Sequence, residues 1–213
     1  KNLRNHDKGK TYKIISQTLH DLGYSVDSKI LNSMDYGDVP QTRERIFIVG
    51  FKDPNTLNHF EFPDKVERTQ EISDLLEPAE DIDDYYYYED KPIWQKIKDY
   101  DFKKDTVYQY RRVYVRENKS GVCPTLTANM GTGGHNVPLI IDDRGVRKLT
   151  PRECFRFQGF PNDYQLPDDI ARSHLYKQAG NTVTATVVAR IAENMKMALD
   201  TQYVLEPTVE IAN

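Results

Sequence analysis

The segment from residue 45 to residue 51 places the strongest constraint on the fold. It contains four consecutive apolar residues, Ile-Phe-Ile-Val, between segments rich in Gly, Pro and Asp. Such a run is typical of a buried strand. Upstream, residues 10–22 carry apolar side chains at helical spacing and are followed by Gly23, and residues 24–32 alternate like a strand. This order predicts the last part of an open α/β sheet whose final strands form a hairpin.

The middle of the chain has a different pattern. Residues 107–115, 125–128 and 137–141 are short β-prone runs, and glycines interrupt them. Short runs separated by turn signals, without helical periodicity, indicate strands that pair locally. We therefore predict a small, irregular, mostly-β domain in this part of the chain.

Two helix signals follow this β-prone region. Thr150 precedes Pro151 and Glu153, which predicts a helix that starts with a Thr N-cap, a proline in the first position and a capping box. Residues 184–199 predict the last helix. Its expected buried face consists of Val187, Val188, Ile191, Ala192 and Met195.

Charge is distributed unevenly along the chain. The formal net charge of −4 does not by itself suggest a nucleic-acid partner. Residues 61–90 contain 12 acidic and 2 basic side chains, whereas residues 103–152 contain 10 basic and 4 acidic ones. Because a protein needs only a local basic face to neutralise phosphates, the basic run is a candidate DNA-binding surface. We interpret the acidic run as solvated surface.

The composition narrows the class of protein further. Two cysteines are too few for a disulfide framework, and no Cys/His cluster has zinc-ligand spacing. We therefore expect no metal site and a reducing, cytoplasmic compartment. No apolar stretch approaches the length of a membrane span and no signal peptide is recognisable, so we expect no membrane partner.

Three motifs in a fixed order carry a family resemblance. Residues 35–51 contain Asp-Tyr-Gly and then Gln-x-Arg-x-Arg before the apolar strand, residues 147–161 contain Leu-Thr-Pro-Arg-Glu-Cys, and residues 180–183 read Gly-Asn-Thr-Val. Together they resemble the eighth, ninth and tenth sequence blocks of DNA (cytosine-5)-methyltransferases. Residues 125–127, Thr-Leu-Thr, resemble a short element of that family's target-recognition domain. The resemblance covers nearly the whole chain but only the second half of the family.

The resemblance implies a fold class and a division into domains. The fold class is α/β: the C-terminal part of a Rossmann-like methyltransferase sheet plus a small, irregular, mostly-β target-recognition domain. We expect residues 1–52 to belong to the catalytic α/β domain and residues 53–172 to the target-recognition domain. Residues 173–213 then form a helix that returns to the catalytic domain.

The first motif supplies candidates for catalytic support. An extended backbone points residues 41, 43 and 45 to one side, and guanidiniums in a partly dry site suit phosphate or base-edge recognition. In the family, the second arginine of this motif contacts the flipped cytosine and the first helps to hold the active-site loop. Arg45 is therefore the best candidate for contact with the target base, with Arg43 and Gln41 in support. For the bare motif, a solvated basic hairpin is the alternative.

The third motif supplies candidates for cofactor contact. Residues 180–183 read as the opening of the last helix, where side-chain and backbone donors face a ligand. In the family this block packs beside S-adenosylmethionine, so the resemblance implies that Asn181, Thr182 and Val183 contact this cofactor in the complete enzyme. A plain helix N-cap is the alternative.

Candidates for DNA contact lie in and around the basic run. The arginines are chosen for charge, the threonines for their match to Thr-Leu-Thr, and the glycines because they permit close backbone approach. The set consists of Arg111, Arg112, Arg116, Thr125, Thr127, Gly133, Gly134, Arg147 and Arg152. Because side chains alternate along a strand, we do not expect the first three arginines to share one face; one face can pair with Glu117 instead.

The family's front-half motifs are not found in this sequence. Cytosine-5 methylation uses a cysteine thiolate and a glutamate on a base flipped out of the helix. In the family these residues lie in Pro-Cys and Glu-Asn-Val, whereas Cys123 precedes a proline and no Glu-Asn-Val occurs. A glycine-rich loop after a first strand, where the methyl-donor pocket usually begins, is not found either.

The expected function follows from this pattern. We expect the C-terminal portion or subunit of a bacterial, nucleoid-associated DNA (cytosine-5)-methyltransferase of a restriction-modification system. It recognises a site in double-stranded DNA, completes the flipped-cytosine and S-adenosylmethionine pockets, and is inactive without the N-terminal half. The alternative is a non-catalytic, sequence-specific DNA-binding module.

Overall fold

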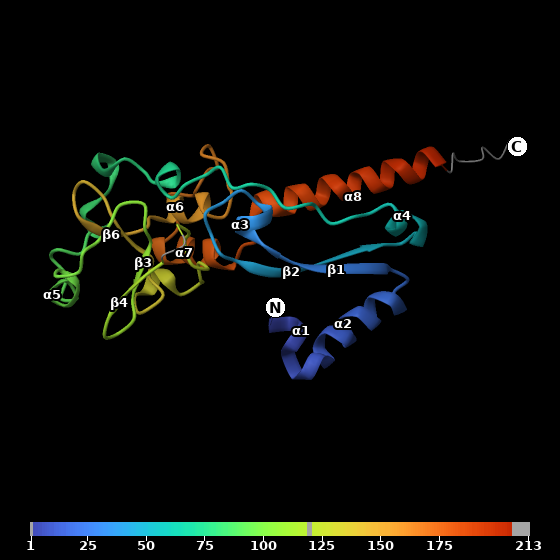
Figure 1. Ribbon diagram of the computed structural model, residues 1–213, viewed down its shortest axis with the longest axis horizontal. Coiled ribbons are helices and arrows are strands. Elements are labelled where there is room, and N and C mark those ends of the chain that lie inside the picture. The colour runs from blue at the N-terminus through green and yellow to red at the C-terminus, as the bar shows by residue number, and fades with distance from the viewer. Residues whose placement is uncertain (1, 119–120, 206–213) are drawn as a thin grey trace, which may run out of the picture. The chain divides into compact units, whose positions relative to one another are not determined.

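The computed structural model describes residues 2–118 and 121–205 and contains two compact units (Figure 1). The first, which we call the hairpin unit, is built from residues up to 32, residues 44–65 and residues from 187 onward. The second, which we call the four-stranded unit, contains residues 33–43 and 66–186. The chain therefore passes between the units several times.

The boundaries of these units differ from the expected domain boundaries. The four-stranded unit includes residues 33–43 and 173–186, and the hairpin unit includes residues 53–65. Compact units report which segments pack together and not what they do. The functional assignment of the domains stays a prediction.

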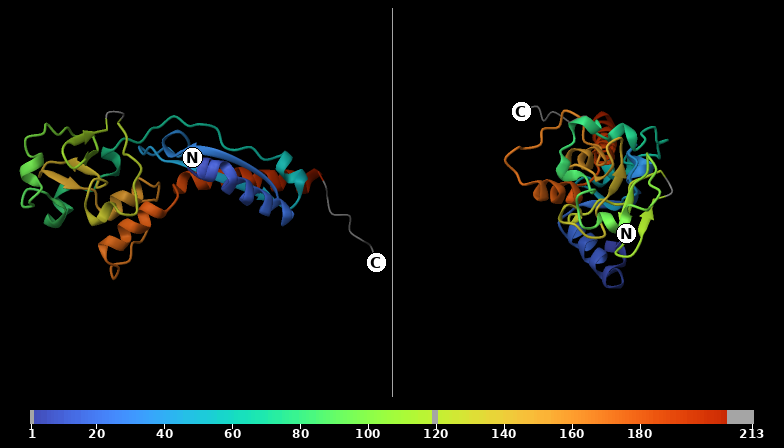
Figure 2. Two further views of the ribbon diagram at one scale, coloured as in Figure 1. Left: turned by 90° about the horizontal axis from the view of Figure 1, so that it is seen from below. Right: turned by 90° about the vertical axis from the view of Figure 1, so that its left-hand side faces the viewer.

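Two antiparallel strands form the centre of the hairpin unit. β1 (Ser25–Asn32) pairs with β2 (Glu44–Phe51) along its whole length. α2 (Lys10–Asp21) and α8 (Ala185–Leu205) lie on opposite sides of this hairpin (Figures 1 and 2). Both predicted strands and the predicted helix before them are confirmed. The shorter elements of this unit are α1 (Asn2–Asn5), the 3₁₀ segment His6–Gly9 and α4 (Pro54–Asn58).

α8 packs through a narrower stripe than the sequence predicted. Val187 and Ile191 are buried as expected, but Val188 is 38% exposed and Ala192 is exposed as well. The buried stripe continues instead through Ala198. Met195 is half-buried and Gln202 is buried, so the buried face includes Met195 but not Val188 and Ala192, and the prediction of those two residues was wrong.

Four short antiparallel strands form the sheet of the second unit, in the order β4-β3-β5-β6. Their bounds are Tyr108–Tyr110 for β3, Val115–Glu117 for β4, Leu139–Ile141 for β5 and Val146–Lys148 for β6. A small, irregular β arrangement was predicted here, but two details differ. The run 107–115 is broken by a turn, and residues 125–128 form no strand because side chains bind the backbone of Leu126 on both sides.

Short helices surround this sheet. α6 (Pro151–Arg156) begins as predicted, since Glu153 N–H donates to Thr150 Oγ1 and Thr150 N–H donates to the Glu153 carboxylate. The other helices of the unit are α3 (Ser33–Tyr36), α5 (Trp94–Ile97) and α7 (Arg172–Asn181). Four 3₁₀ segments complete it: Ser73–Leu75, Ala79–Asp81, Asp84–Tyr86 and Met130–Thr132.

The core of the four-stranded unit lies between the sheet and these helices. Cys123 and Cys154 are free thiols buried in it, and burial raises the pKa of both. A buried protonated thiol is a poor nucleophile, and both side chains pack within the hydrophobic core. In the described part of the chain, no helix is long and apolar enough to cross a membrane.

Candidate functional site

Arg43 joins three of the motifs. Its side chain is 2% exposed, and its guanidinium donates to backbone carbonyls of two other segments. Nη1 lies 2.9 Å from Leu126 O, and Nη2 lies 3.1 Å from Gly180 O and 2.5 Å from Thr182 O. The guanidinium therefore ties the first motif to the Thr-Leu-Thr segment and to the Gly-Asn-Thr-Val segment.

Gln41 adds the remaining motif to the same place. It is fully buried, its Nε2 donates to Phe157 O at 2.7 Å, and its Oε1 accepts from Leu126 N–H at 3.0 Å. Thr125 Oγ1 donates to Thr42 O at 2.7 Å alongside. We call this cluster, centred on Gln41, Arg43 and Leu126, the motif junction.

Gly180 packs flat against the Thr-Leu-Thr segment. A Cβ on Gly180 would lie 2.3 Å from the carbonyl carbon of Thr127 and 2.4 Å from Ala128 N. No side chain fits in that space, because both neighbours are backbone atoms. The glycine thus allows the end of α7 to meet the motif junction.

The Gly-Asn-Thr-Val motif closes a helix rather than opening one. α7 ends at Asn181, Thr182 N–H donates to Gln178 O at 2.9 Å, and α8 begins only at Ala185. The prediction of a helix N-terminus here was wrong. Carbonyls at the end of α7 need donors, and Arg43 provides them.

Two side chains of this motif remain accessible. Asn181 is exposed and Val183 is 45% exposed, whereas Thr182 is only partly exposed. The segment therefore combines a fixed backbone with side chains directed outward. The predicted cofactor contacts are retained as candidates with side chains, not helix N–H groups, as the contacting atoms.

Arg45 belongs to the hairpin unit and not to the motif junction. It lies on β2 opposite Leu31, and its Nη1 donates to Glu44 O at 2.8 Å. Its side chain is half-buried, and burial lowers the pKa of the guanidinium from its ordinary value. Such a group remains charged at neutral pH and is poorly solvated, which strengthens its attraction for an anionic or carbonyl ligand.

The predicted DNA contacts at residues 111–116 lie on a β-hairpin. β3 and β4 are its two strands, and Arg112 and Arg116 are exposed on it. Arg111 and Arg112 line a hollow of about 240 Å³ together with His135. Glu117 interacts with Lys103 at 3.7 Å and accepts from the Tyr100 hydroxyl. Within the described residues it forms no ion pair with these arginines, so of the two options, packing or pairing with Glu117, pairing is not found.

Gly133 and Gly134 lie in open space. Their φ angles are 94° and 83°, and no heavy atom lies within 4 Å of a Cβ built on either residue. They therefore serve the backbone conformation and leave the surface free for an external partner.

Arg147 is not available for phosphate. It is fully buried, its Nη2 lies 2.7 Å from Glu153 Oε1, and its Nε lies 2.5 Å from Asp142 Oδ2. Burial by itself lowers the pKa of Arg147, but Glu153 and Asp142 outweigh it and raise that pKa. The expected DNA contact by Arg147 is therefore wrong, because two carboxylates occupy its guanidinium.

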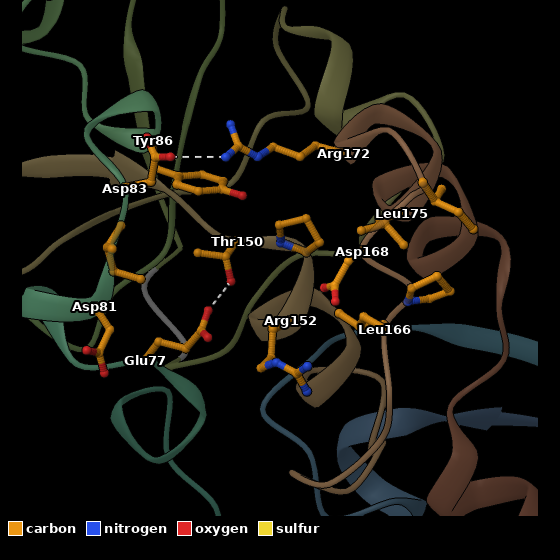
Figure 3. Close-up of a pocket in the computed structure, with 14 residues that line it drawn as sticks. Glu77, Asp81, Asp83, Tyr86, Thr150, Arg152, Leu166, Asp168, Arg172 and Leu175 are labelled. Carbon is orange, nitrogen blue, oxygen red and sulfur yellow. Dashed lines mark hydrogen bonds and ion pairs between the residues drawn. The ribbon is translucent and has the colours of Figure 1, made fainter.

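Arg152 lies at the rim of a cavity of about 330 Å³ in the same unit (Figure 3). Its Nη1 donates to Asn162 O at 3.2 Å and to Tyr164 O at 3.0 Å, which holds the loop after α6. Two interactions join residues that line the cavity. The Thr150 hydroxyl donates to the Glu77 carboxylate, and Arg172 forms an ion pair with Asp83. Arg152 thus has an internal role besides the predicted one.

The sequence did not reveal two polar groups that organise the interior, the buried Gln158 and the partly buried Asp142. Gln158 is fully buried, and its Nε2 donates to Ala179 O at 2.8 Å, which fixes α7 beside the motif junction. Asp142 reaches Arg147 across the β5–β6 turn. The available sequence signal for this pair was a short turn with an acidic residue on one side and a basic residue on the other. Such a pattern does not show whether the pair is buried.

Residues 1–197 match the sequence profile of the family described as C-5 cytosine-specific DNA methylase. The chain belongs to this family. Among curated relatives, the Type II methyltransferase M.Bsp6I of Bacillus sp. (strain RFL6) is 52% identical over 197 residues, which cover 92% of this chain and 62% of that protein. The Type II methyltransferase M.HaeII of Haemophilus aegyptius is 37% identical, over 94% of this chain and 59% of that protein. The chain thus spans roughly three fifths of the length of these methylase relatives.

Solved structures confirm the methyltransferase-like α/β fold. The Entamoeba histolytica methyltransferase EhMeth matches with a TM-score of 0.67 at 17% identity, over 89% of this chain and 58% of that one. The S. pombe Dnmt2 methyltransferase matches with a TM-score of 0.65 at 19% identity, over 91% of this chain and 65% of that one. At these identities the likeness concerns the fold alone.

Proposed function

We propose that this chain is the C-terminal, DNA-recognising portion of a cytosine-5 DNA methyltransferase of a bacterial restriction-modification system. In this proposal residues 53–172 are the target-recognition domain, residues 1–52 complete the catalytic sheet, and residues 173–213 return to the catalytic domain. Methyl transfer requires the family's front half, as a preceding segment or a separate chain.

The motif junction is the observation that carries this proposal. Arg43 and Gln41 hold together four segments that are up to 139 residues apart in sequence. All four segments are those whose motifs resemble the family. A module that only bound DNA would not need the exposed Asn181 and Val183 side chains fixed beside such a junction.

Exposed apolar surface on the hairpin unit supports the part of the proposal that adds further strands to its sheet. Within the described residues its sheet has two strands, and Ile46, Phe47 and Ile48 on β2 are only half-buried. On α2, Ile14 is 65% exposed and Leu22 is 59% exposed. A two-stranded hairpin is marginally stable by itself, so these apolar surfaces suit additional strands and helices.

The exposed arginines of the β3–β4 hairpin supply the DNA-binding surface in this proposal. Double-stranded DNA attracts such a surface through its phosphates, and a two-stranded ribbon fits the major groove. Thr125, Thr127, Gly133, Gly134 and Arg152 are proposed as further contacts. Arg45, on the other unit, is the proposed contact to the flipped cytosine.

S-adenosylmethionine is the proposed methyl donor, which supplies the methyl group when bound. Asn181 and Val183 fit such a ligand because both side chains are exposed next to a backbone that Arg43 and Gly180 hold still. The turn offers a polar amide and an apolar surface, which suit an amino-acid or ribose group and an adenine ring. The fixed geometry reduces the entropy lost on binding.

Reconstitution tests the proposal. Methyl transfer from radiolabelled S-adenosylmethionine to DNA is measured for the chain alone and with a separately produced front half that carries Pro-Cys and Glu-Asn-Val. We expect no transfer from the chain alone and clear transfer from the mixture. Turnover by the isolated chain would refute the proposal, and DNA binding without restored transfer would favour the non-catalytic DNA-binding module.

Arg45 is tested in the same mixture. We expect Arg45→Ala to reduce turnover at least tenfold, because a charged hydrogen bond to the substrate is lost. Lys29→Ala on the neighbouring strand is the control, since Lys29 is exposed on β1. Equal turnover of Arg45→Ala and the unaltered chain would remove the assignment of Arg45 to the target base.

A further inference from the structure

The cavity beside Arg152 has an apolar floor. Ile82, Pro151 and Leu175 line it and are buried. Its volume of about 330 Å³ lies at the lower end of the range for small-molecule sites, about 300–1,000 Å³. The cavity is therefore large enough for a small ligand that has an apolar part.

A buried hydroxyl group in this cavity has no partner. Tyr86 is 7% exposed, and within the described residues its hydroxyl forms no hydrogen bond. The Tyr86 ring extends into the cavity with the hydroxyl at its far end (Figure 3). Burial raises the pKa of Tyr86, so the hydroxyl stays protonated at neutral pH. Because a buried tyrosine hydroxyl usually has a hydrogen-bond partner, this one points to a polar ligand group in the cavity.

Carboxylates line the cavity from two separate segments. Glu77 and Asp81 precede Tyr86 in the chain, whereas Asp168 lies on the loop between α6 and α7, on the other side of the cavity (Figure 3). Among the residues that the structure describes, Asp81 and Asp168 form no ion pair. Carboxylates on two sides of one cavity attract a ligand that is positively charged at both ends.

The arginines of the cavity do not cancel this charge. Arg172 pairs with Asp83 at 3.0 Å, and Arg152 binds backbone carbonyls of the loop after α6. Four carboxylates and two guanidiniums line the cavity, which gives it a formal net charge of −2. In the described part of the chain no group of three His, Cys, Asp or Glu side chains could hold a metal ion. The charge therefore indicates an organic cation.

We propose that this cavity binds an aliphatic diamine or polyamine. The methylene chain lies on the apolar floor, the terminal ammonium groups pair with carboxylates on the two sides, and the Tyr86 hydroxyl accepts from an ammonium N–H. A lysine or arginine side chain of a protein partner brings one positive charge, whereas a diamine brings two to the same small cavity. Part of the acidic run then binds a ligand, a role beyond solvated surface and independent of DNA.

Calorimetric titration of the full chain with putrescine tests the proposal. The salt concentration is about 0.15 M, at which attraction between distant surface charges is largely screened. We expect one putrescine to bind per chain. n-Butylamine has the same carbon chain but one charge and should bind about tenfold more weakly. Mg²⁺ has the same charge but no carbon chain and should not displace putrescine.

Tyr86→Phe connects binding to the cavity, because it removes only the hydroxyl that has no partner. We expect it to weaken putrescine binding about tenfold and to leave urea unfolding unchanged. Tyr85→Phe is the matched control, since Tyr85 is the neighbouring tyrosine, is 47% exposed and does not line the cavity. This control should bind putrescine like the unaltered chain.

A pair of double variants tests the carboxylates. Replacing Asp81 and Asp168 together by Asn removes one charge from each side of the cavity, and we expect putrescine binding to weaken about tenfold. Glu80→Gln combined with Asp169→Asn changes the net charge equally at the adjacent, exposed residues, which do not line the cavity. This control should retain the affinity of the unaltered chain.

Four outcomes would overturn the proposal. Putrescine does not bind, n-butylamine binds as tightly as putrescine, Tyr86→Phe binds like the unaltered chain, or the two double variants lose affinity equally through general surface charge. A lysine-containing peptide that binds through Tyr86 more tightly than putrescine would also overturn it and identify a protein-docking site. None of these outcomes affects the proposed methyltransferase function, which reconstitution tests separately.

Discussion

Four arginines of the four-stranded unit occur in two contrasting regions. Arg43 and Arg147 lie in the interior, where carbonyl or carboxylate oxygens surround their guanidiniums. Arg112 and Arg116 lie on the β3–β4 hairpin, and within the described residues no acceptor binds their side chains. The same residue type thus fixes the fold in one region and is left for an external anion in the other.

Burial decides what a charged arginine contributes to this unit. A buried guanidinium needs acceptors for its N–H groups, because burying an unpaired charge costs far more free energy than leaving that charge in water. A guanidinium that is fully buried among internal acceptors cannot also neutralise a phosphate. Substitutions should therefore change stability in the interior and DNA binding on the hairpin.

The largest expected effect is at the buried ion cluster. Glu153→Gln keeps the shape and the capping-box acceptor but leaves Arg147 short of one negative charge. We expect a loss of about 3–5 kcal/mol in the free energy of unfolding. The measurement is urea unfolding followed by the fluorescence of Trp94, the single tryptophan, which lies in this unit. Asp83→Asn, which breaks the exposed pair with Arg172, should leave the midpoint unchanged; equal effects of the two would contradict the contrast.

A smaller effect is expected at the motif junction. Arg43→Lys keeps the charge but removes the planar fork that reaches Leu126 and Gly180 together. Because hydrogen bonds to charged groups contribute about 1.5–3 kcal/mol, we expect a loss of about 2 kcal/mol in urea unfolding. Arg112→Lys on the hairpin is the control and should unfold like the unaltered chain. An unchanged free energy of unfolding for Arg43→Lys would show that the motif junction does not depend on the planar guanidinium of Arg43.

Two glycines extend the comparison to the backbone. Gly180→Ala puts a methyl group against the Thr127 backbone, and such overpacking costs about 1–3 kcal/mol. The methyl group of Gly134→Ala meets no atom, so its cost comes only from the positive φ at this position, and we expect a loss of about 1 kcal/mol in the free energy of unfolding. Thermal unfolding of both variants checks the order. A more stable Gly180→Ala would mean that α7 does not pack against the Thr-Leu-Thr segment.

Acid should weaken the interior region through Asp142. Burial by itself raises the pKa of Asp142, but hydrogen bonds from Arg147, Arg144 N–H and Tyr87 outweigh it and lower that pKa. A lowered folded pKa stabilises the protein above the unfolded value, near 4, and this contribution is lost as the pH falls through the folded pKa. We expect unfolding stability to fall below about pH 4. Asp142→Asn should be less stable at pH 7 and should lose less on acidification; an unchanged pH dependence would contradict this.

The sequence predicted the elements whose signals are local. The Ile-Phe-Ile-Val run, the Gly23 helix end and the Thr150 capping box depend on neighbouring residues, and all three are confirmed. The prediction that Val188 and Ala192 on α8 are buried was wrong, since burial there depends on how much surface the partner elements provide. Helical periodicity indicates which face of a helix is apolar, but not how much of that face the neighbouring elements bury.

The roles of single polar residues were harder to predict. Arg147 and Arg152 look alike in sequence, but only the first meets two carboxylates, which the β5–β6 turn and α6 bring together. The Gly-Asn-Thr-Val motif was assigned to a helix start because Asn and Thr favour that position, whereas contacts of Gly180 and Arg43 place it at a helix end. Long-range contacts decided both cases.

The salt dependence of DNA binding tests the contrast between the two regions most directly. The affinity of the chain for a duplex is measured from 50 to 200 mM salt, before and after replacing Arg111, Arg112 and Arg116 together by Gln. Each lost phosphate contact lowers the slope of log affinity against log salt by about 0.9, so we expect a slope that is shallower by about 2 to 3, with the free energy of unfolding unchanged. An unchanged slope, or a triple variant that unfolds more easily, would contradict it.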